Sequence, residues 1–171
     1  MSIQFSPVIA TQARGKGSAF SVKQIDLREL GEKASPVTVL ADFRVLERPF
    51  GPHPHAGFSA VTYVFEDSKG ALRARDSLGN DAVIGPGGIV WTQAGTGLMH
   101  HEVPAENDRE LHGLHIIVNL SARNKLAPPK VLRLEGHDVP RNAAGDRVRV
   151  AVGAFEGVFS PIVPVEPFQL A

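Results

Sequence analysis

The 171-residue chain contains no cysteine, which excludes disulfide bonds, thiolate metal ligands and cysteine nucleophiles together. Any metal that it binds must therefore be held by nitrogen and oxygen atoms. The chain also lacks an excess of either charge, because 18 Lys and Arg residues balance 18 Asp and Glu residues. A surface that binds nucleic acid directly needs clustered cations to neutralise phosphates, so no nucleic-acid partner is expected.

Long apolar runs are missing as well. No segment approaches the roughly 18 consecutive apolar residues of a membrane-spanning helix, and residues 1–20 lack the basic start and apolar centre of a secretory signal. We therefore expect a cytoplasmic protein with no membrane partner. A chain of this length is expected to fold as a single domain around its own core.

Turn-forming residues are abundant, since 17 Gly and 13 Pro separate short segments rich in Val, Ile, Leu, Thr and Phe. This pattern of short apolar segments separated by turns is typical of an all-β sandwich or barrel. A short helical element is predicted at Ile25–Lys33, and residues 124–146 are predicted to be a loop because prolines interrupt them. The expected strands are Val37–Val45, Ala60–Phe65, Ala71–Ser77, Gly88–Gln93, Leu111–Leu120 and Arg147–Ala154.

Two short motifs combine metal-binding side chains at alternating positions. His53 and His55 flank one proline, and His100 and Glu102 flank His101. In extended backbone, side chains two positions apart leave the same face, so each pair converges and His101 points away. A single His-x-His pair is often only a loop feature, but a second pair that includes a carboxylate favours one metal site.

Three imidazoles and one carboxylate suit Fe(II), Mn(II), Ni(II), Co(II), Cu(II) or Zn(II), and such a ligand set leaves two positions open on an octahedral ion. These positions allow dioxygen and a chelating substrate to bind side by side. Glu102 would then act as a ligand and also as the base that takes a proton from a bound hydroxyl group.

Other side chains are candidates for lining the pocket. His112 shares a strand face with Leu114 and Ile116 and is predicted to point inward, as a pocket residue or as a hydrogen-bonded core histidine, whereas His115 is predicted to point outward. Four aromatic residues are candidates for an apolar pocket around a flat ligand, the alternative being an ordinary core position. They are Phe50, Phe58, Tyr63 and Trp91.

Longer stretches resemble the pirin family of the cupin superfamily. These are PHPHAGFSAVTYVFE, GPGGIVWTQAGTGLMHHEVP and LHGLHIIVNLSARNKLAPPK, and the family's two metal motifs fall on His53, His55, His100 and Glu102. The resemblance implies a jelly-roll β-barrel with one metal ion, usually iron, at these residues. Ala56 and Ser59 depart from the family, because they stand where it has a charged pair.

The resemblance also implies a domain organisation. Residues 1–156 correspond to the N-terminal cupin barrel, and residues 157–171 correspond to the start of a second barrel that this sequence does not contain. The final segment is apolar and rich in proline, so it is predicted to be an extended tail. It would pack on its own barrel or on a sheet edge of the partner in a homodimer.

Two functions follow from these expectations. The first is an Fe(II)-dependent dioxygenase of the quercetin 2,3-dioxygenase type, with a flavonol-like aromatic and dioxygen as substrates. The alternative is a non-enzymatic regulatory protein whose metal state changes the surface that it offers to another protein. The resemblance carries both, because members of the family are linked to each role.

Overall fold

The computed structural model describes residues 7–14, 19–48, 50–142 and 148–171. Within these ranges the chain forms two main antiparallel sheets, with the strand orders β1-β2-β3-β10-β5-β8-β11 and β4-β9-β6-β7, and a small hairpin of β12 and β13. The strands are β1 (Thr11–Arg14), β2 (Phe20–Ile25), β3 (Val37–Val45), β4 (His53–His55), β5 (Phe58–Val64), β6 (Leu72–Asp76), β7 (Asp81–Ile84), β8 (Ile89–Gln93), β9 (Leu98–Pro104), β10 (Leu111–Asn119), β11 (Lys130–Leu134), β12 (Ala154–Phe155) and β13 (Val158–Phe159).

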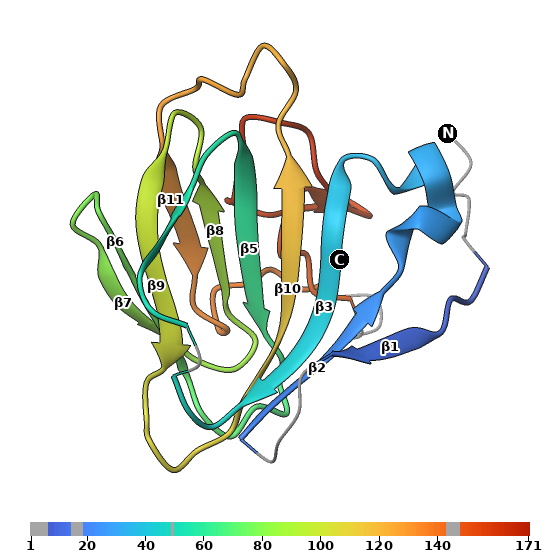
Figure 1. The fold of residues 1–171 in the computed structure, drawn as a ribbon. Coiled ribbons are helices and arrows are strands. Elements are labelled where there is room, and N and C mark those ends of the chain that lie inside the picture. The colour runs from blue at the N-terminus through green and yellow to red at the C-terminus, as the bar shows by residue number, and fades with distance from the viewer. Residues whose placement is uncertain (1–6, 15–18, 49, 143–147) are drawn as a thin grey trace.

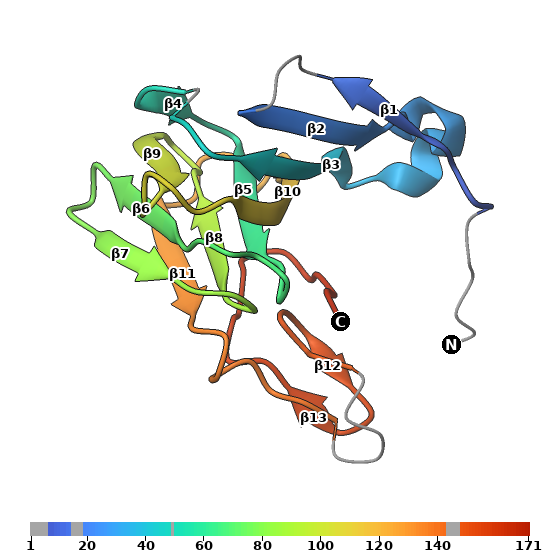
Figure 2. The same ribbon diagram turned by 90° about the horizontal axis from the view of Figure 1, so that it is seen from below.

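The two main sheets face each other, and the C-terminal segment lies on the opposite side of the larger one (Figures 1 and 2). The predicted all-β jelly-roll barrel is thereby confirmed. None of the helical segments in the described ranges is long and apolar enough to span a membrane.

Apolar side chains fill the space between the two sheets at one end of the barrel. Val64 and Val90 come from the larger sheet, and Leu72 and Ile84 come from the smaller one; each is at most 1% exposed. Strand alternation explains this arrangement, because every second side chain of β5 and β8 points into the barrel. Leu72 of this core also lines a cavity that continues between the two sheets.

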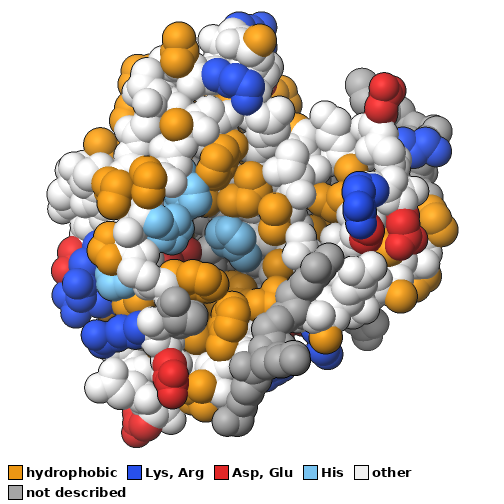
Figure 3. All heavy atoms as spheres, in the orientation of Figure 1, with side chains coloured by type: hydrophobic (Ala, Val, Ile, Leu, Met, Phe, Trp, Pro, Cys, Tyr) orange, Lys and Arg blue, Asp and Glu red, His pale blue; other side chains and the backbone are white. Residues whose placement is uncertain are grey.

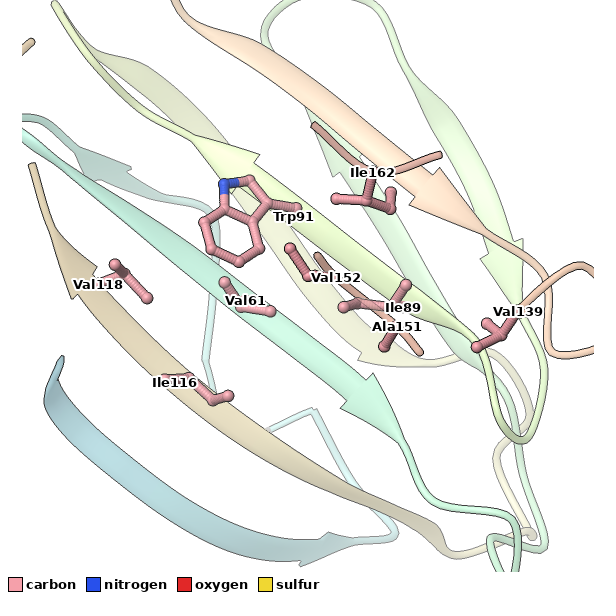
Figure 4. Packing of buried hydrophobic residues seen from close by; sticks show 9 residues of the cluster. All are labelled: Val61, Ile89, Trp91, Ile116, Val118, Val139, Ala151, Val152 and Ile162. Carbon is pink, nitrogen blue, oxygen red and sulfur yellow. The ribbon is translucent and has the colours of Figure 1, made fainter. Parts of the chain in front are cut away.

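A second core lies on the outer face of the larger sheet (Figure 4). There Trp91 and Val61 are covered by Ile162 and Val152 from the C-terminal part of the chain, and Phe168 packs against the Trp91 ring with the centroids 5.3 Å apart. Polar contacts hold the same segment, because the Gln93 side chain accepts a hydrogen bond from the Val165 amide. Of the two predicted positions for the tail, the structure therefore shows packing on its own barrel.

Two expectations about secondary structure need correction, and a third is confirmed. Residues 130–134 were predicted to be loop but form β11, because Pro128 and Pro129 precede the strand and lie outside its hydrogen bonds with β8. The strand predicted at Arg147–Ala154 is replaced by isolated bridges of Arg149 and Val152, and its first residue lies outside the described ranges. The short helical element predicted at Ile25–Lys33 is confirmed as the 3-10 helix η1 (Leu27–Ala34), whose first turn is capped by the Asp26 carboxylate.

The C-terminal segment is expected to contribute strongly to stability. Ile162 is 3% exposed in the outer core, whereas the next residue, Val163, is 68% exposed. Ile162→Ala should lower the free energy of unfolding by about 2–4 kcal/mol and the melting temperature by roughly 4–16 °C, because truncation leaves a cavity. Val163→Ala is the matched control and should change stability by less than about 0.5 kcal/mol. Thermal and denaturant melts measure both, and equal effects would show that the segment does not pack as described.

Candidate metal centre

The two histidine motifs lie on neighbouring strands of the smaller sheet. β4 pairs with β9, and His53 stands directly opposite His100 in this register. Gly95 forms the turn before β9 with φ = 52°, and an added Cβ atom would lie 1.9 Å from the Ala127 carbonyl oxygen. Only glycine fits there, and the turn fixes the point at which β9 begins.

Three imidazole nitrogens converge at one point. The Nε2 atom of His100 lies 2.7 Å from Nε2 of His55 and 3.1 Å from Nε2 of His53. Nitrogen atoms bound at right angles to one ion, at the usual 2.0–2.2 Å, would be about 3 Å apart. The spacing of the three nitrogens therefore fits a single metal ion.

The hydrogen positions on these rings also favour a cation. The Nδ1 atom of His53 donates a hydrogen bond to the Gly51 carbonyl oxygen at 2.9 Å, so in the neutral ring its Nε2 atom carries a lone pair. The Nε2 atom of His100 has at most one hydrogen to share between two neighbouring nitrogens. Burial, followed by the nearby His100 and His53, lowers the pKa of His55 to about 4, so this ring is neutral near pH 7. Converging lone pairs repel one another unless a cation lies between them.

Glu102 stands beside this group of histidines. Its Oε2 atom accepts a hydrogen bond from the Thr62 hydroxyl at 2.6 Å, and its Oε1 atom lies 3.6 Å from Nδ1 of His100. Both Oε1 and that Nδ1 atom are buried and have no hydrogen-bond partner among the described residues. Burial acts to raise the pKa of Glu102, but the neighbouring His100 and the Thr62 hydrogen bond outweigh it, and the pKa is lowered. A buried carboxylate oxygen with no partner suits a metal ligand.

The structure therefore brings His53, His55 and His100 together and places Glu102 next to them. Ligation by all four residues stays a prediction. The alternation expected from the sequence is seen on β9, because Met99 is 42% exposed while the next residue, His100, is 4% exposed.

A cavity of about 350 Å³ opens beside the histidines, between the two sheets. Figure 3 shows histidine side chains around a hollow that is bordered by apolar side chains. Phe50 lines this cavity, as the sequence suggested, and Phe58 packs against the His55 ring with the centroids 4.8 Å apart. The volume of this cavity falls within the range of small-molecule sites.

Tyr63, Trp91 and His112 do not line this cavity, so pocket lining is wrong for all three, and the alternative given for each, a core or hydrogen-bonded position, holds. Tyr63 and Trp91 belong to the outer core, because odd-numbered residues of β5 and β8 point away from the barrel interior. The His112 ring is also directed outside the barrel, where its Nδ1 atom lies 2.6 Å from Asp67 and its Nε2 atom lies 3.2 Å from Asp42. His112 does share a face with Ile116, as predicted, but the C-terminal segment covers that face.

His115 lines the cavity instead, although the sequence predicted that it points outward. Its Nδ1 atom lies 3.3 Å from the Thr62 hydroxyl oxygen, and burial lowers the pKa of its ring. The prediction that His112 and His115 lie on opposite faces of β10 is correct. Both faces of this strand are covered, however, and the sequence assigned the wrong one to the barrel interior. One clue was available: the consecutive apolar residues Ile116–Val118 are typical of a strand that is buried on both faces.

Thr62 is expected to tune the metal affinity through Glu102. Thr62→Val keeps the side-chain shape and removes the hydrogen bond to Oε2, so metal affinity should fall about 10- to 100-fold, as for other residues that orient a ligand. Ser59→Ala is the control, because the Ser59 hydroxyl is buried on the opposite face of the same strand and has no hydrogen-bond partner among the described residues. Calorimetric titration with Mn²⁺ measures both, and equal affinities would show that Thr62 does not orient the carboxylate.

Comparison with known proteins agrees with this geometry. The family model described as Pirin matches residues 10–118. A Pseudomonas aeruginosa protein named "Putative quercetin 2,3-dioxygenase" is 42% identical over 109 residues, which are 63% of this chain and 37% of that protein. A Caulobacter vibrioides protein named "Pirin-like protein" is 41% identical over 116 residues, which are 66% of this chain and 41% of that protein.

A solved structure agrees as well. The structure of a quercetin 2,3-dioxygenase from Acinetobacter baumannii superposes with a TM-score of 0.77 and 25% identity, over 94% of this chain and 60% of that one. The matched part of this chain spans about two fifths of the length of the Pseudomonas aeruginosa and Caulobacter vibrioides relatives. The family model covers more than half of the chain and both metal motifs, and we conclude that the chain belongs to the pirin family.

Proposed function

We propose that this protein is a metal-dependent dioxygenase of the quercetin 2,3-dioxygenase type, with Fe(II) as the metal at His53, His55, His100 and Glu102. The observation that carries the proposal is the convergence of three Nε2 atoms at a mainly apolar cavity of about 350 Å³. The names of a curated relative and of a solved structure support the substrate class, because both refer to quercetin 2,3-dioxygenase. A metal ion bound there would supply Lewis-acid polarisation of a chelating substrate and a binding position for dioxygen.

The residues of this chain perform the remaining tasks. Glu102 is placed to accept the proton of a hydroxyl group that binds at the centre, and Thr62 keeps its carboxylate in position. Phe50 and Phe43 line the cavity and suit the flat apolar body of a flavonol. Their apolar surfaces also limit the access of water to the reacting atoms.

Reconstitution with defined metals tests the proposal. The untagged 171-residue chain is stripped with a chelator, loaded anaerobically with Fe, Mn, Ni, Co or Cu, and mixed with quercetin and oxygen. We expect loss of the flavonol absorption band and matching oxygen consumption with at least one metal, most rapidly with Fe(II). The metal-free protein is the control, and no turnover with any of the five metals would overturn the proposal.

A further inference from the structure

One row of four side chains, three of them polar, crosses the inner face of the larger sheet near Glu102. Gln24 on β2 stands opposite Ala41 on β3. His115 on β10 lies between Ala41 and Thr62 of β5 in the same register. All four residues of the row line the cavity. Because neighbouring strands are about 4.8 Å apart, the row from Thr62 to Gln24 extends over roughly 14 Å.

The rows on either side of this one are apolar where they meet the cavity. On one side of the row, Val22 of β2 pairs with Phe43 of β3. On the other side, Val39 lies on β3, two residues before the Ala41 of the row. All three line the cavity. The wall therefore offers one polar strip between apolar surfaces. Such a wall fits a flat ligand that carries polar groups along one edge.

The hydrogen bonds of this strip determine which ring nitrogen of His115 carries hydrogen. The Thr62 hydroxyl has a single hydrogen, which it donates to the Glu102 carboxylate at 2.6 Å. Towards His115 the same oxygen can only accept, so the Nδ1 atom at 3.3 Å must carry a hydrogen. In the neutral ring the lone pair is then on Nε2.

This Nε2 atom is available to a ligand. It makes no hydrogen bond to any residue in the described ranges, and it is not among the fully buried polar atoms that lack a partner. His115 lines the cavity, so the accessible side of its ring is the side that faces the cavity. An acceptor in a mainly apolar wall favours ligands that donate a hydrogen bond at that point.

We propose that His115 is a specificity-determining residue, whose Nε2 atom accepts a hydrogen bond from a ligand hydroxyl group other than the one that chelates the metal. Gln24 extends the same strip towards the edge of the sheet and offers a further polar contact. This inference rests on the proposed function, because it takes a hydroxylated flavonol as the ligand. It adds to that function the residue that distinguishes a polyhydroxylated flavonol from one with the chelating group alone.

Binding of two flavonols tests the inference without turnover. Quercetin carries several hydroxyl groups, whereas 3-hydroxyflavone keeps only the chelating hydroxyl and ketone. Both are titrated anaerobically by calorimetry into the metal-loaded 171-residue chain. His115→Phe should weaken quercetin binding about three- to tenfold, the contribution of one hydrogen bond, and should change 3-hydroxyflavone binding less than about twofold. His115→Gln, which keeps an acceptor, should restore part of the quercetin affinity.

The controls separate recognition from a loss of structure. His137 has a side chain that is 81% exposed, so His137→Gln should leave both affinities unchanged. If His115→Phe does not fold, His115→Leu removes the same polar atoms with a smaller side chain and gives the same readout. Equal losses for both ligands, no loss for either, or a wild-type protein that binds neither flavonol would overturn the inference. Selective binding without turnover would overturn only the proposed reaction.

Discussion

His100→Ala is expected to abolish stoichiometric binding of a divalent metal, with affinity reduced by well over 100-fold. The side chain is 4% exposed, and its Nε2 atom is the one that lies near the Nε2 atoms of both His53 and His55. Loss of a direct ligand should exceed the roughly 10- to 100-fold effects of residues that only orient ligands. Elemental analysis and competition with a chelator of known affinity provide the measurement.

The neighbouring residue provides a matched control for this change. His101 lies on the same strand but points to the opposite face, so His101→Ala removes an imidazole without removing a converging nitrogen. We expect metal content and affinity close to those of the unchanged chain. A similar loss in both variants would mean that the strand, and not the Nε2 atom of His100, determines metal binding.

Glu102→Gln is expected to reduce turnover about 10²- to 10⁴-fold, the usual contribution of a general base. The amide keeps the shape of the side chain, and its carbonyl oxygen can still accept the Thr62 hydrogen bond. It cannot take the proton of a bound hydroxyl group. Single-turnover kinetics at equal metal content separate this effect from weaker metal binding.

A second glutamate serves as the control for the loss of charge. Glu32 is exposed on η1, so Glu32→Gln changes the net charge equally and should leave turnover unchanged. If Glu102→Gln retains turnover within about threefold at equal metal content, the proton acceptor must be another group.

Local sequence was sufficient to predict the histidine site. His53 and His55 share a face because they are two residues apart in extended backbone, and the same holds for His100 and Glu102. The predicted strand Val37–Val45 matches β3 at both ends. These features depend on alternation and turn chemistry, which nearby residues determine. The exact position of Glu102 depends on Thr62, a residue of another strand, and was not predictable in the same way.

Errors arose where a residue's environment depends on distant segments. The outer face of β5, β8 and β10 is apolar because residues 150–170 cover it, and no local pattern distinguishes that face from the barrel interior. Tyr63, Trp91 and His112 were therefore expected in the pocket although they lie on the covered face. The prolines before β11 likewise indicated a loop, because the sequence does not show that β8 is available as a partner.

The sequence by itself predicted the fold class from its short apolar segments, the family from the resemblance of longer stretches, and the convergence of the histidines from spacing within a few residues. Only the tertiary structure decided which of the two buried faces of the larger sheet encloses the cavity. The histidine of β10 that lines the cavity, beside Thr62, is therefore His115 and not His112. The physical reason is that a strand covered on both faces has the same alternating pattern whichever face points inward.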